Sequence, residues 1–191
     1  MFIRIGFDMK EQIICAGFGG QGVMILGKLI AYSAMNRCLN VTWMPSYGAE
    51  VRGGTAHCMV VISDEEVASP IIEYCTAAII MNKPSLGKFI NMFKAHNRQP
   101  QAQNLLLLNS SLVDEDIKKK GVETIRIPVT EIAHQMGDAR AANMIILGAY
   151  SKKRSIMCRK DIVKGIRIAF AGNKDAIDLN IRALDKGASL V

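Results

Sequence analysis

The sequence predicts an α/β fold, in which a mostly parallel, Rossmann-like sheet carries helices on both faces and leads into a helical C-terminal third. Three observations support this fold class. Short apolar runs alternate with helical patterns over the first two thirds of the chain, the first two runs each end in a glycine-rich turn, and the last third carries helical patterns only. A length of 191 residues suits one domain with a full core, so we expect a single domain over residues 1–191.

The first elements follow the order strand, glycine turn, helix, strand. Glu11–Ala16 is short, apolar and stopped by glycine, as expected of a buried strand. Gln21–Met35 carries apolar residues at helical spacing, and Leu39–Met44 reads as the next strand, which Pro45 ends. This order predicts a βαβ unit.

The remaining elements follow from apolar runs and capping residues. We expect further strands over residues 55–63, 77–81, 105–108 and 122–127. Pro84 is expected to open a helix, and short helical patterns follow at 133–136 and 140–150. Ser155 is the expected N-cap of a helix that runs to about residue 170. Asn173 is expected to cap the last helix, with Gly187 just past its end.

Charge and hydropathy narrow the classes of partner. The net charge is +7, but the basic residues are spread out and are not interleaved with aromatic ones, which argues against nucleic acid. No apolar run is long enough to span a bilayer, and no charged leader precedes an apolar signal region. Five widely spaced cysteines without a Cys-x-x-Cys pair argue against a zinc or iron–sulfur cradle and for a reduced, cytoplasmic protein.

The first glycine turn has the spacing of a dinucleotide-binding turn. Its candidate residues are Gly17, Gly19, Gly20, Gln21 and Gly22. Glycines after a strand let backbone amides approach a phosphate at a helix N-terminus, although they also serve close packing of strand and helix, and both interpretations stay open. NAD itself is disfavoured, because the second strand ends without the acidic residue that holds the ribose.

The second glycine turn, Ser46–Thr55, is rich in recognition groups. Its candidate residues are Tyr47, Glu50, Arg52, Gly53 and Gly54. Arg52 could fork onto a phosphate or carboxylate, which favours a binding or interface role; the alternative is an ordered loop in which Glu50 simply pairs with Arg52. Because both turns follow strands, we expect them side by side in one crevice at the carboxyl end of the sheet.

Four motifs together resemble a known family. Ile13–Gly22, Ser46–Thr55, Met81–Leu86 and Ala142–Gly148 are similar, in order and spacing, to the gamma subunit of 2-oxoacid:ferredoxin (acceptor) oxidoreductases. The resemblance covers nearly the whole chain and is strongest to the 2-oxoglutarate enzyme. The matching candidates are the residues of both turns, with Asn82 and Asn143 added as residues that hold loops in place. Thr76 departs from the family's aspartate, and the resemblance implies that this removes a charge near the crevice.

The resemblance implies a role within a complex. Such enzymes convert a 2-oxoacid and coenzyme A to acyl-CoA and carbon dioxide, and pass electrons to ferredoxin, flavodoxin or a similar acceptor. The complex uses thiamine diphosphate, Mg²⁺ and iron–sulfur clusters, which the alpha, beta and delta subunits hold. The gamma subunit is implied to bind none of them alone, to be inactive in isolation, to carry no catalytic residue and to help shape the coenzyme A site.

Two other functions remain open on the residues alone. One is a stand-alone Rossmann-like enzyme that uses NADP or a flavin, and the other is a coenzyme A- or nucleotide-binding module without a redox role. For a subunit of a complex, we also expect self-association to a homodimer in isolation, because apolar surface meant for the partners would be exposed.

Overall fold

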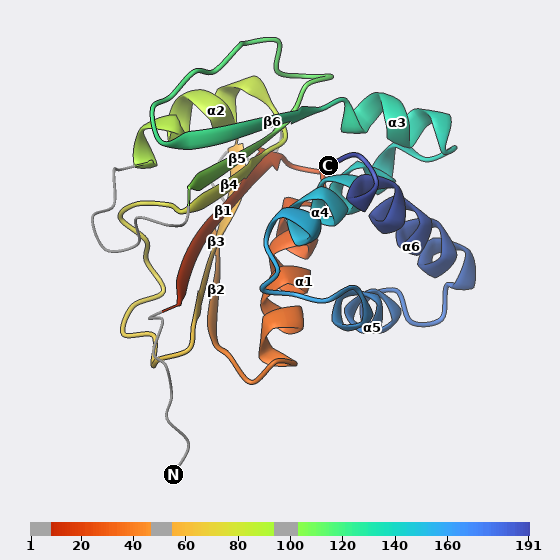
Figure 1. Ribbon diagram of the computed structural model, residues 1–191. Coiled ribbons are helices and arrows are strands. Elements are labelled where there is room, and N and C mark those ends of the chain that lie inside the picture. Colours follow the sequence, from red (N-terminus) through yellow and green to blue (C-terminus); the bar gives the residue numbers. More distant parts are fainter. Residues whose placement is uncertain (1–8, 47–54, 94–102) are drawn as a thin grey trace.

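The computed structural model describes residues 9–46, 55–93 and 103–191, which form a six-stranded sheet flanked by helices (Figure 1). The strands are β1 (Lys10–Phe18), β2 (Asn40–Ser46), β3 (Thr55–Ser63), β4 (Ala77–Ile80), β5 (Asn104–Asn109) and β6 (Val122–Ile127). The α-helices are α1 (Val23–Met35), α2 (Lys83–Phe89), α3 (Val129–Gln135), α4 (Ala142–Lys153), α5 (Arg159–Ala169) and α6 (Lys174–Ala188). Two short 3₁₀ turns, η1 (Ile90–Met92) and η2 (Ala139–Ala141), follow α2 and precede α4.

The sheet confirms the expected fold class with one change in pairing. Its strand order is β2-β3-β1-β4-β5-β6, and β1, β4, β5 and β6 pair in parallel. β3 runs antiparallel between β1 and β2, so β1 and β2 are not the adjacent parallel pair of a simple βαβ unit. The physical reason is that two strands separated by a short connection can pair directly as antiparallel neighbours, whereas parallel pairing needs a long crossover.

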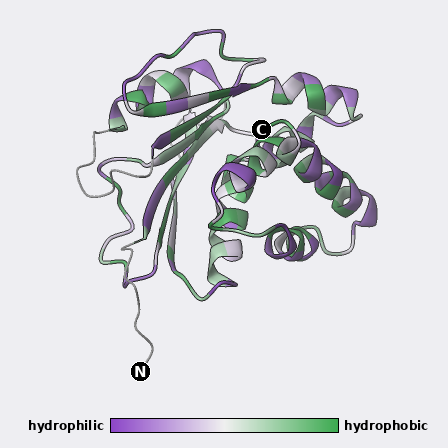
Figure 2. Cartoon of the chain, viewed as in Figure 1, coloured by the Kyte–Doolittle hydropathy of each residue, from purple (hydrophilic) through white to green (hydrophobic). Residues whose placement is uncertain are grey.

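The two faces of the sheet bury separate apolar cores. Ile13 and Cys15 of β1 point to one face, where α1, α4, α5 and α6 pack, and Ile14 and Ala16 point to the other, which α2 covers. This follows from the two-residue alternation of a strand, and it confirms helices on both faces. Figure 2 shows α1 and α4 largely apolar, and the outer sides of α5 and α6 hydrophilic.

Helix α4 is the central helix of the larger core. Every residue from Ala142 to Tyr150 is buried, and α6 packs directly against it. A Cβ atom on Gly148 would collide with the backbone oxygen of Leu184, and one on Gly187 with that of Ile145. The prediction that Gly187 lies past the end of the last helix is therefore wrong, because it lies inside α6, where only glycine permits this backbone approach.

The helix starts match the predicted caps in two of three cases. The Asn173 side chain accepts a hydrogen bond from the Ala176 amide at 3.0 Å, which confirms the cap of α6. Pro84 stands in the first turn of α2, as expected. Ser155 is not the cap of α5, which begins at Arg159: the Arg37 guanidinium binds the Ser155 and Ile156 carbonyls at 2.7 and 2.8 Å and holds that segment outside the helix.

The amino end of the sheet is closed by a buried charged group. The Glu11 carboxylate of β1 accepts a hydrogen bond from the Tyr150 hydroxyl at 3.2 Å and pairs with Arg154 Nε at 3.1 Å. Arg154 also binds the Gln103 carbonyl at 2.7 Å, just before β5 begins. Burial raises the pKa of Glu11, and the Arg154 charge opposes that shift. This network ties the end of α4 to the strands.

Candidate functional site

The first glycine turn lies at the carboxyl end of β1 and opens α1. The Gln21 amide donates to the Phe18 carbonyl at 3.2 Å, and Gly20 and Gly22 adopt left-handed φ angles of 96° and 71°. Gly22 is the N-cap of α1, where no side chain caps the helix and no acidic residue stands in its first turn. The first amide groups of α1 are thus available to an anionic ligand, and the helix dipole favours one.

The half of the turn that contains Gly17 and Gln21 is held by hydrogen bonds and close contacts. Gln21 Oε1 accepts hydrogen bonds from the Phe18 amide at 2.7 Å and from Asn82 Nδ2 at 3.3 Å, and Gln21 Nε2 donates to the Met81 carbonyl at 3.3 Å. A Cβ on Gly17 would lie 2.6 Å from Gln21 Oε1. Asn82 is buried and also caps α2, where its side chain accepts from the Ser85 amide at 2.9 Å. Gly17, Gln21 and Asn82 therefore shape the turn.

The other half of the turn is open. Gly19 and Gly20 are exposed, and a Cβ on Gly20 would meet nothing within 4 Å. Asn143, at the start of α4, donates through Nδ2 to the Gly22 carbonyl at 3.2 Å. Asn143 is only 4% exposed, and its Oδ1 has no hydrogen-bond partner among the described residues. A buried acceptor without a partner costs free energy unless a ligand or water satisfies it.

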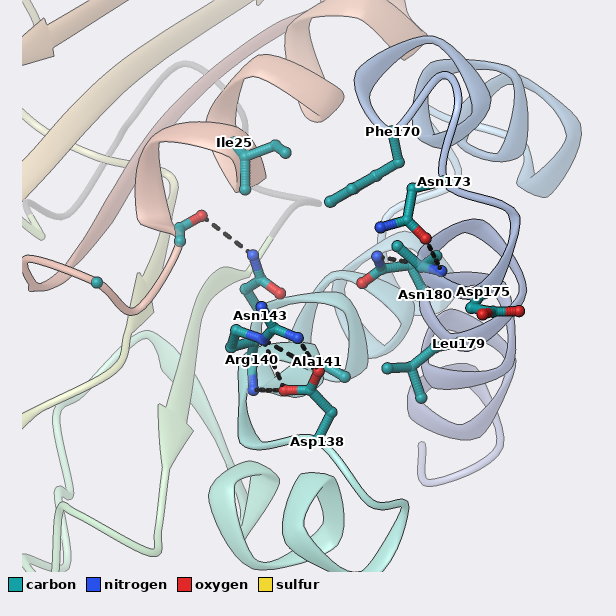
Figure 3. A pocket seen from close by; sticks show the side chains of 13 residues that line it. Ile25, Asp138, Arg140, Ala141, Asn143, Phe170, Asn173, Asp175, Leu179 and Asn180 are labelled. Carbon is teal, nitrogen blue, oxygen red and sulfur yellow. Dashed lines mark hydrogen bonds and ion pairs between the residues drawn. The ribbon is translucent and has the colours of Figure 1, made fainter.

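A cavity of about 520 Å³ adjoins this open half (Figure 3). Its walls come from the first glycine turn, the start of α1, the η2–α4 segment, the end of α5 and the first half of α6. The lining residues are Gly20, Gly22, Ile25, Asp138, Arg140, Ala141, Asn143, Phe170, Asn173, Asp175, Ala176, Leu179 and Asn180. Its size is typical of a small-molecule site.

Charge and an aromatic ring are both present at the cavity wall. Arg140 pairs with Asp138 at 2.6 Å, and this hydrogen-bonded pair lowers the pKa of Asp138 to about 2. Phe170 and Leu179 contribute apolar surface, and Figure 3 shows Asn143, Phe170 and Asn180 around the same cavity. The cavity wall thus offers one unpartnered acceptor, the carboxylates of Asp138 and Asp175, and an aromatic face, beside the free amides of α1.

The structure describes the two residues that flank the second glycine turn, Ser46 and Thr55. Tyr47, Glu50, Arg52, Gly53 and Gly54 lie outside the described residues. Ser46 ends β2, and Thr55, which begins β3, lies opposite Phe18 at the end of β1. Both turns therefore connect to the same end of the strands. The cavity seen in the described part lies on the α4–α6 side of the first turn, and a crevice between the two turns stays a prediction.

The expectation for Thr76 is wrong. Thr76 precedes β4 at the amino end of the sheet, where its Oγ1 accepts from the Gln12 amide at 2.9 Å. It therefore lies at the opposite end of the strands from the glycine turns. The first residue of a parallel strand lies at the amino end of the sheet, opposite the loops that follow the carboxyl ends of the strands.

Sequence reasoning missed the cavity residues from η2, from the end of α5 and from α6, among them Arg140 and Phe170. Asn173 was recognised as a cap, but no local pattern indicates that the start of α6 meets a turn near residue 20. In the described residues, no three His, Cys, Asp or Glu side chains converge as metal ligands. None of the helices found there is long and apolar enough to cross a membrane.

Comparison with known proteins identifies the class to which this fold and turn belong. The family model described as pyruvate ferredoxin/flavodoxin oxidoreductase matches residues 12–190, so the chain belongs to this family. The ketoisovalerate oxidoreductase subunit VorA of Methanothermobacter thermautotrophicus is 34% identical over 94% of the chain, which spans 36% of that relative's length. The 2-oxoglutarate synthase subunit KorC of Methanothermobacter marburgensis is 26% identical over 96% of the chain and 97% of its own length.

Solved structures share the fold. A keto/oxoacid ferredoxin oxidoreductase gamma subunit from Geobacter sulfurreducens superposes with a TM-score of 0.76 at 23% identity, over 94% of this chain and 96% of that one. The 2-oxoglutarate:ferredoxin oxidoreductase from Magnetococcus marinus gives a TM-score of 0.83 at 23% identity, over 95% of this chain and 31% of that one. The expected fold is thus found in both a separate subunit and part of a longer chain.

Proposed function

We propose that this chain is the gamma subunit of a 2-oxoacid:acceptor oxidoreductase complex and that its cavity forms part of the coenzyme A site. Family membership and the names of the relatives support the first part. The second part rests on one observation, namely a cavity that joins the uncapped start of α1 to the unpartnered Oδ1 of Asn143.

The donor set fits coenzyme A, which combines phosphates, an adenine ring and an amide-containing arm. The amides at the start of α1 suit a phosphate. Phe170 suits stacking on adenine, and Asn143 Oδ1 suits an amine or amide N–H. When bound, coenzyme A supplies the thiol that receives the acyl group, while this chain orients it.

The other cofactors belong to the partners in this proposal. Thiamine diphosphate, Mg²⁺ and the iron–sulfur clusters are assigned to the alpha, beta and delta subunits, and ferredoxin or flavodoxin to the acceptor role. The isolated chain then has no oxidoreductase activity of its own.

We propose 2-oxoglutarate as the substrate of the complex. The match over nearly the full length of a 2-oxoglutarate synthase subunit supports it. A branched-chain 2-oxoacid is the second candidate, favoured by the higher identity to a ketoisovalerate oxidoreductase subunit. Selection between them lies with the subunits that bind the 2-oxoacid.

The complex and its substrate can be tested together. The tagged chain would be purified from its native cells, and the eluate assayed for coenzyme A-dependent reduction of a viologen dye with each 2-oxoacid. Activity with 2-oxoglutarate and three companion subunits is expected. Activity with the branched-chain acid alone would move the assignment to the second candidate. A lone chain that binds NADP tightly would contradict the proposal and favour a stand-alone enzyme.

The coenzyme A site needs a separate test on the purified complex. Asn143→Ala removes the Oδ1 acceptor and also the Nδ2 hydrogen bond to Gly22. The KM for coenzyme A is expected to rise at least about tenfold, as loss of one buried hydrogen bond of roughly 1.4 kcal/mol already implies, with the KM for the 2-oxoacid unchanged. The matched control is Asn40→Ala, an exposed asparagine at the start of β2. Equal KM values for coenzyme A in both variants would exclude this cavity from the site.

A further inference from the structure

Two cysteines of neighbouring strands face each other in the larger core. Cys15 of β1 and Cys58 of β3 are register partners in the antiparallel pair, and both are fully buried in the core that α1 covers. Directly opposed residues in such a pair have Cα atoms about 4.5 to 5.5 Å apart. A disulfide spans Cα separations of roughly 4.4 to 6.8 Å, so the register of these two residues is compatible with a bridge.

The two thiols influence each other's titration: their mutual interaction raises the pKa of Cys15 and lowers that of Cys58. The Cys58 thiol in turn donates to the carbonyl of Val23, the first residue of α1, at 3.3 Å. Gly27 leaves room for this arrangement, because a Cβ there would collide with Cys58 Sγ.

The other cysteines have different surroundings. Cys75 is buried in the core on the opposite face of the sheet, and Cys38 is exposed at the end of α1. Cys158 precedes α5 and donates to Asp161 Oδ2 at 2.6 Å. Among the five, Cys15 and Cys58 are the register partners of one strand pair.

We propose that Cys15 and Cys58 form an oxidative modification site, a dithiol that reacts with hydroperoxides and closes to a disulfide between β1 and β3. With hydrogen peroxide, the Cys58 sulfur attacks one peroxide oxygen, the O–O bond breaks, and one water leaves as Cys58 becomes a sulfenic acid. The Cys15 sulfur then attacks the Cys58 sulfur, the S–S bond forms, the S–O bond breaks, and a second water leaves. Two thiols are oxidised by two electrons and one peroxide is reduced to two waters.

Both sulfurs are buried, so the proposed reaction requires the start of α1 to open and admit the peroxide. Hydrogen peroxide is close to water in size, and the Cys58 thiol bonds to the first residue of a helix that has no side-chain cap. In this proposal the first turn of α1 opens locally, while the strand pairing of the sheet stays intact. The bridge lies two residues before Gly17 and joins the strand that enters the first glycine turn to the strand that begins after the second. Oxidation therefore locks together the strands that carry both turns.

The test uses the full chain, reduced and then treated with hydrogen peroxide under native conditions. Remaining thiols are blocked with an alkylating reagent, and the digested chain is mapped by mass spectrometry while circular dichroism reports the fold. We expect a peptide that links Cys15 to Cys58, two hydrogen atoms lighter than the reduced pair and released by dithiothreitol. Cys58→Ala should lose this species, and the matched control Cys75→Ala, also buried, should keep it.

Several outcomes would overturn the proposal. One is that Cys15 and Cys58 are both recovered as alkylated thiols from folded chain in which exposed Cys38 has been oxidised. Others are that the link forms only in denaturant, or that Cys58 pairs with a different cysteine. In Cys15→Ala the second step is blocked, so a dimedone adduct should mark Cys58 as a sulfenic acid. The map of the unsubstituted chain decides the proposal if a variant does not fold.

Discussion

The two ends of the parallel strands are built differently, and one helix reaches both. At the amino end, Tyr150 and Arg154 of the α4 region supply the Glu11 carboxylate with a hydrogen bond and an ion pair. At the carboxyl end, Asn143 of the same helix holds Gly22 but keeps an acceptor without a partner beside a cavity. The amino end thus has its buried polar groups paired, whereas the carboxyl end, where we propose the ligand site, leaves one unpaired.

The largest expected effect breaks the amino end. Arg154→Met removes the cation that pairs with Glu11 and leaves a buried carboxylate uncompensated. We expect the free energy of unfolding at pH 7 to fall by about 3 kcal/mol, measured by urea denaturation. The double variant Glu11→Gln/Arg154→Met should recover part of that loss, because no charge is then left buried. A loss of stability equal in the single and double variants would show that Arg154 acts through its carbonyl contacts alone.

A smaller effect is expected at the carboxyl end from Gly22→Ala. Its φ of 71° costs an alanine about 1 to 2 kcal/mol, and the new Cβ would also collide with Asn143 Nδ2. Gly20→Ala is the matched control, because its φ of 96° carries a similar backbone cost but its Cβ would meet nothing. In the purified complex, Gly22→Ala should raise the KM for coenzyme A more than Gly20→Ala does. Equal KM values for coenzyme A in the Gly22→Ala and Gly20→Ala variants would show that Asn143 does not take part in binding coenzyme A.

Local patterns were sufficient for the elements, while long-range contacts decided the rest of the fold. The strands Thr55–Ser63 and Val122–Ile127 have the predicted bounds, because their apolar runs are bounded by turn residues. The insertion of β3 between β1 and β2 depends on pairing, which no single run encodes. The start of α5 differs from the predicted one because Arg37, 118 residues before Ser155 in the sequence, binds the carbonyl of Ser155.

For the candidate site, too, local patterns predicted some residues, and long-range contacts decided how they are arranged. Glycine spacing predicted the first turn, and the family resemblance added Asn82 and Asn143. The resemblance could not indicate that Gln21 and Asn82 face the packed half of the turn and Asn143 the cavity. Asn143 and Gly22 are 121 residues apart, and Phe170 comes from the end of α5, so only the packing of α1, α4 and α5 brings these groups together.

The smallest expected effect concerns the pH dependence of the amino end. Burial raises the pKa of Glu11 above its ordinary value of 4.5, so the folded chain holds this proton more tightly than the unfolded chain does. The stability that Glu11 contributes is therefore complete below about pH 4.5 and is lost as the pH rises through the folded pKa. Glu11→Gln removes this titration, so the free energy of unfolding of the natural chain minus that of the variant should fall with rising pH above that value. Urea midpoints over a pH series measure this difference. A difference that grows with pH would mean that the attraction between Glu11 and Arg154 outweighs the cost of burying the Glu11 carboxylate. The ion pair would then stabilise the amino end of the sheet.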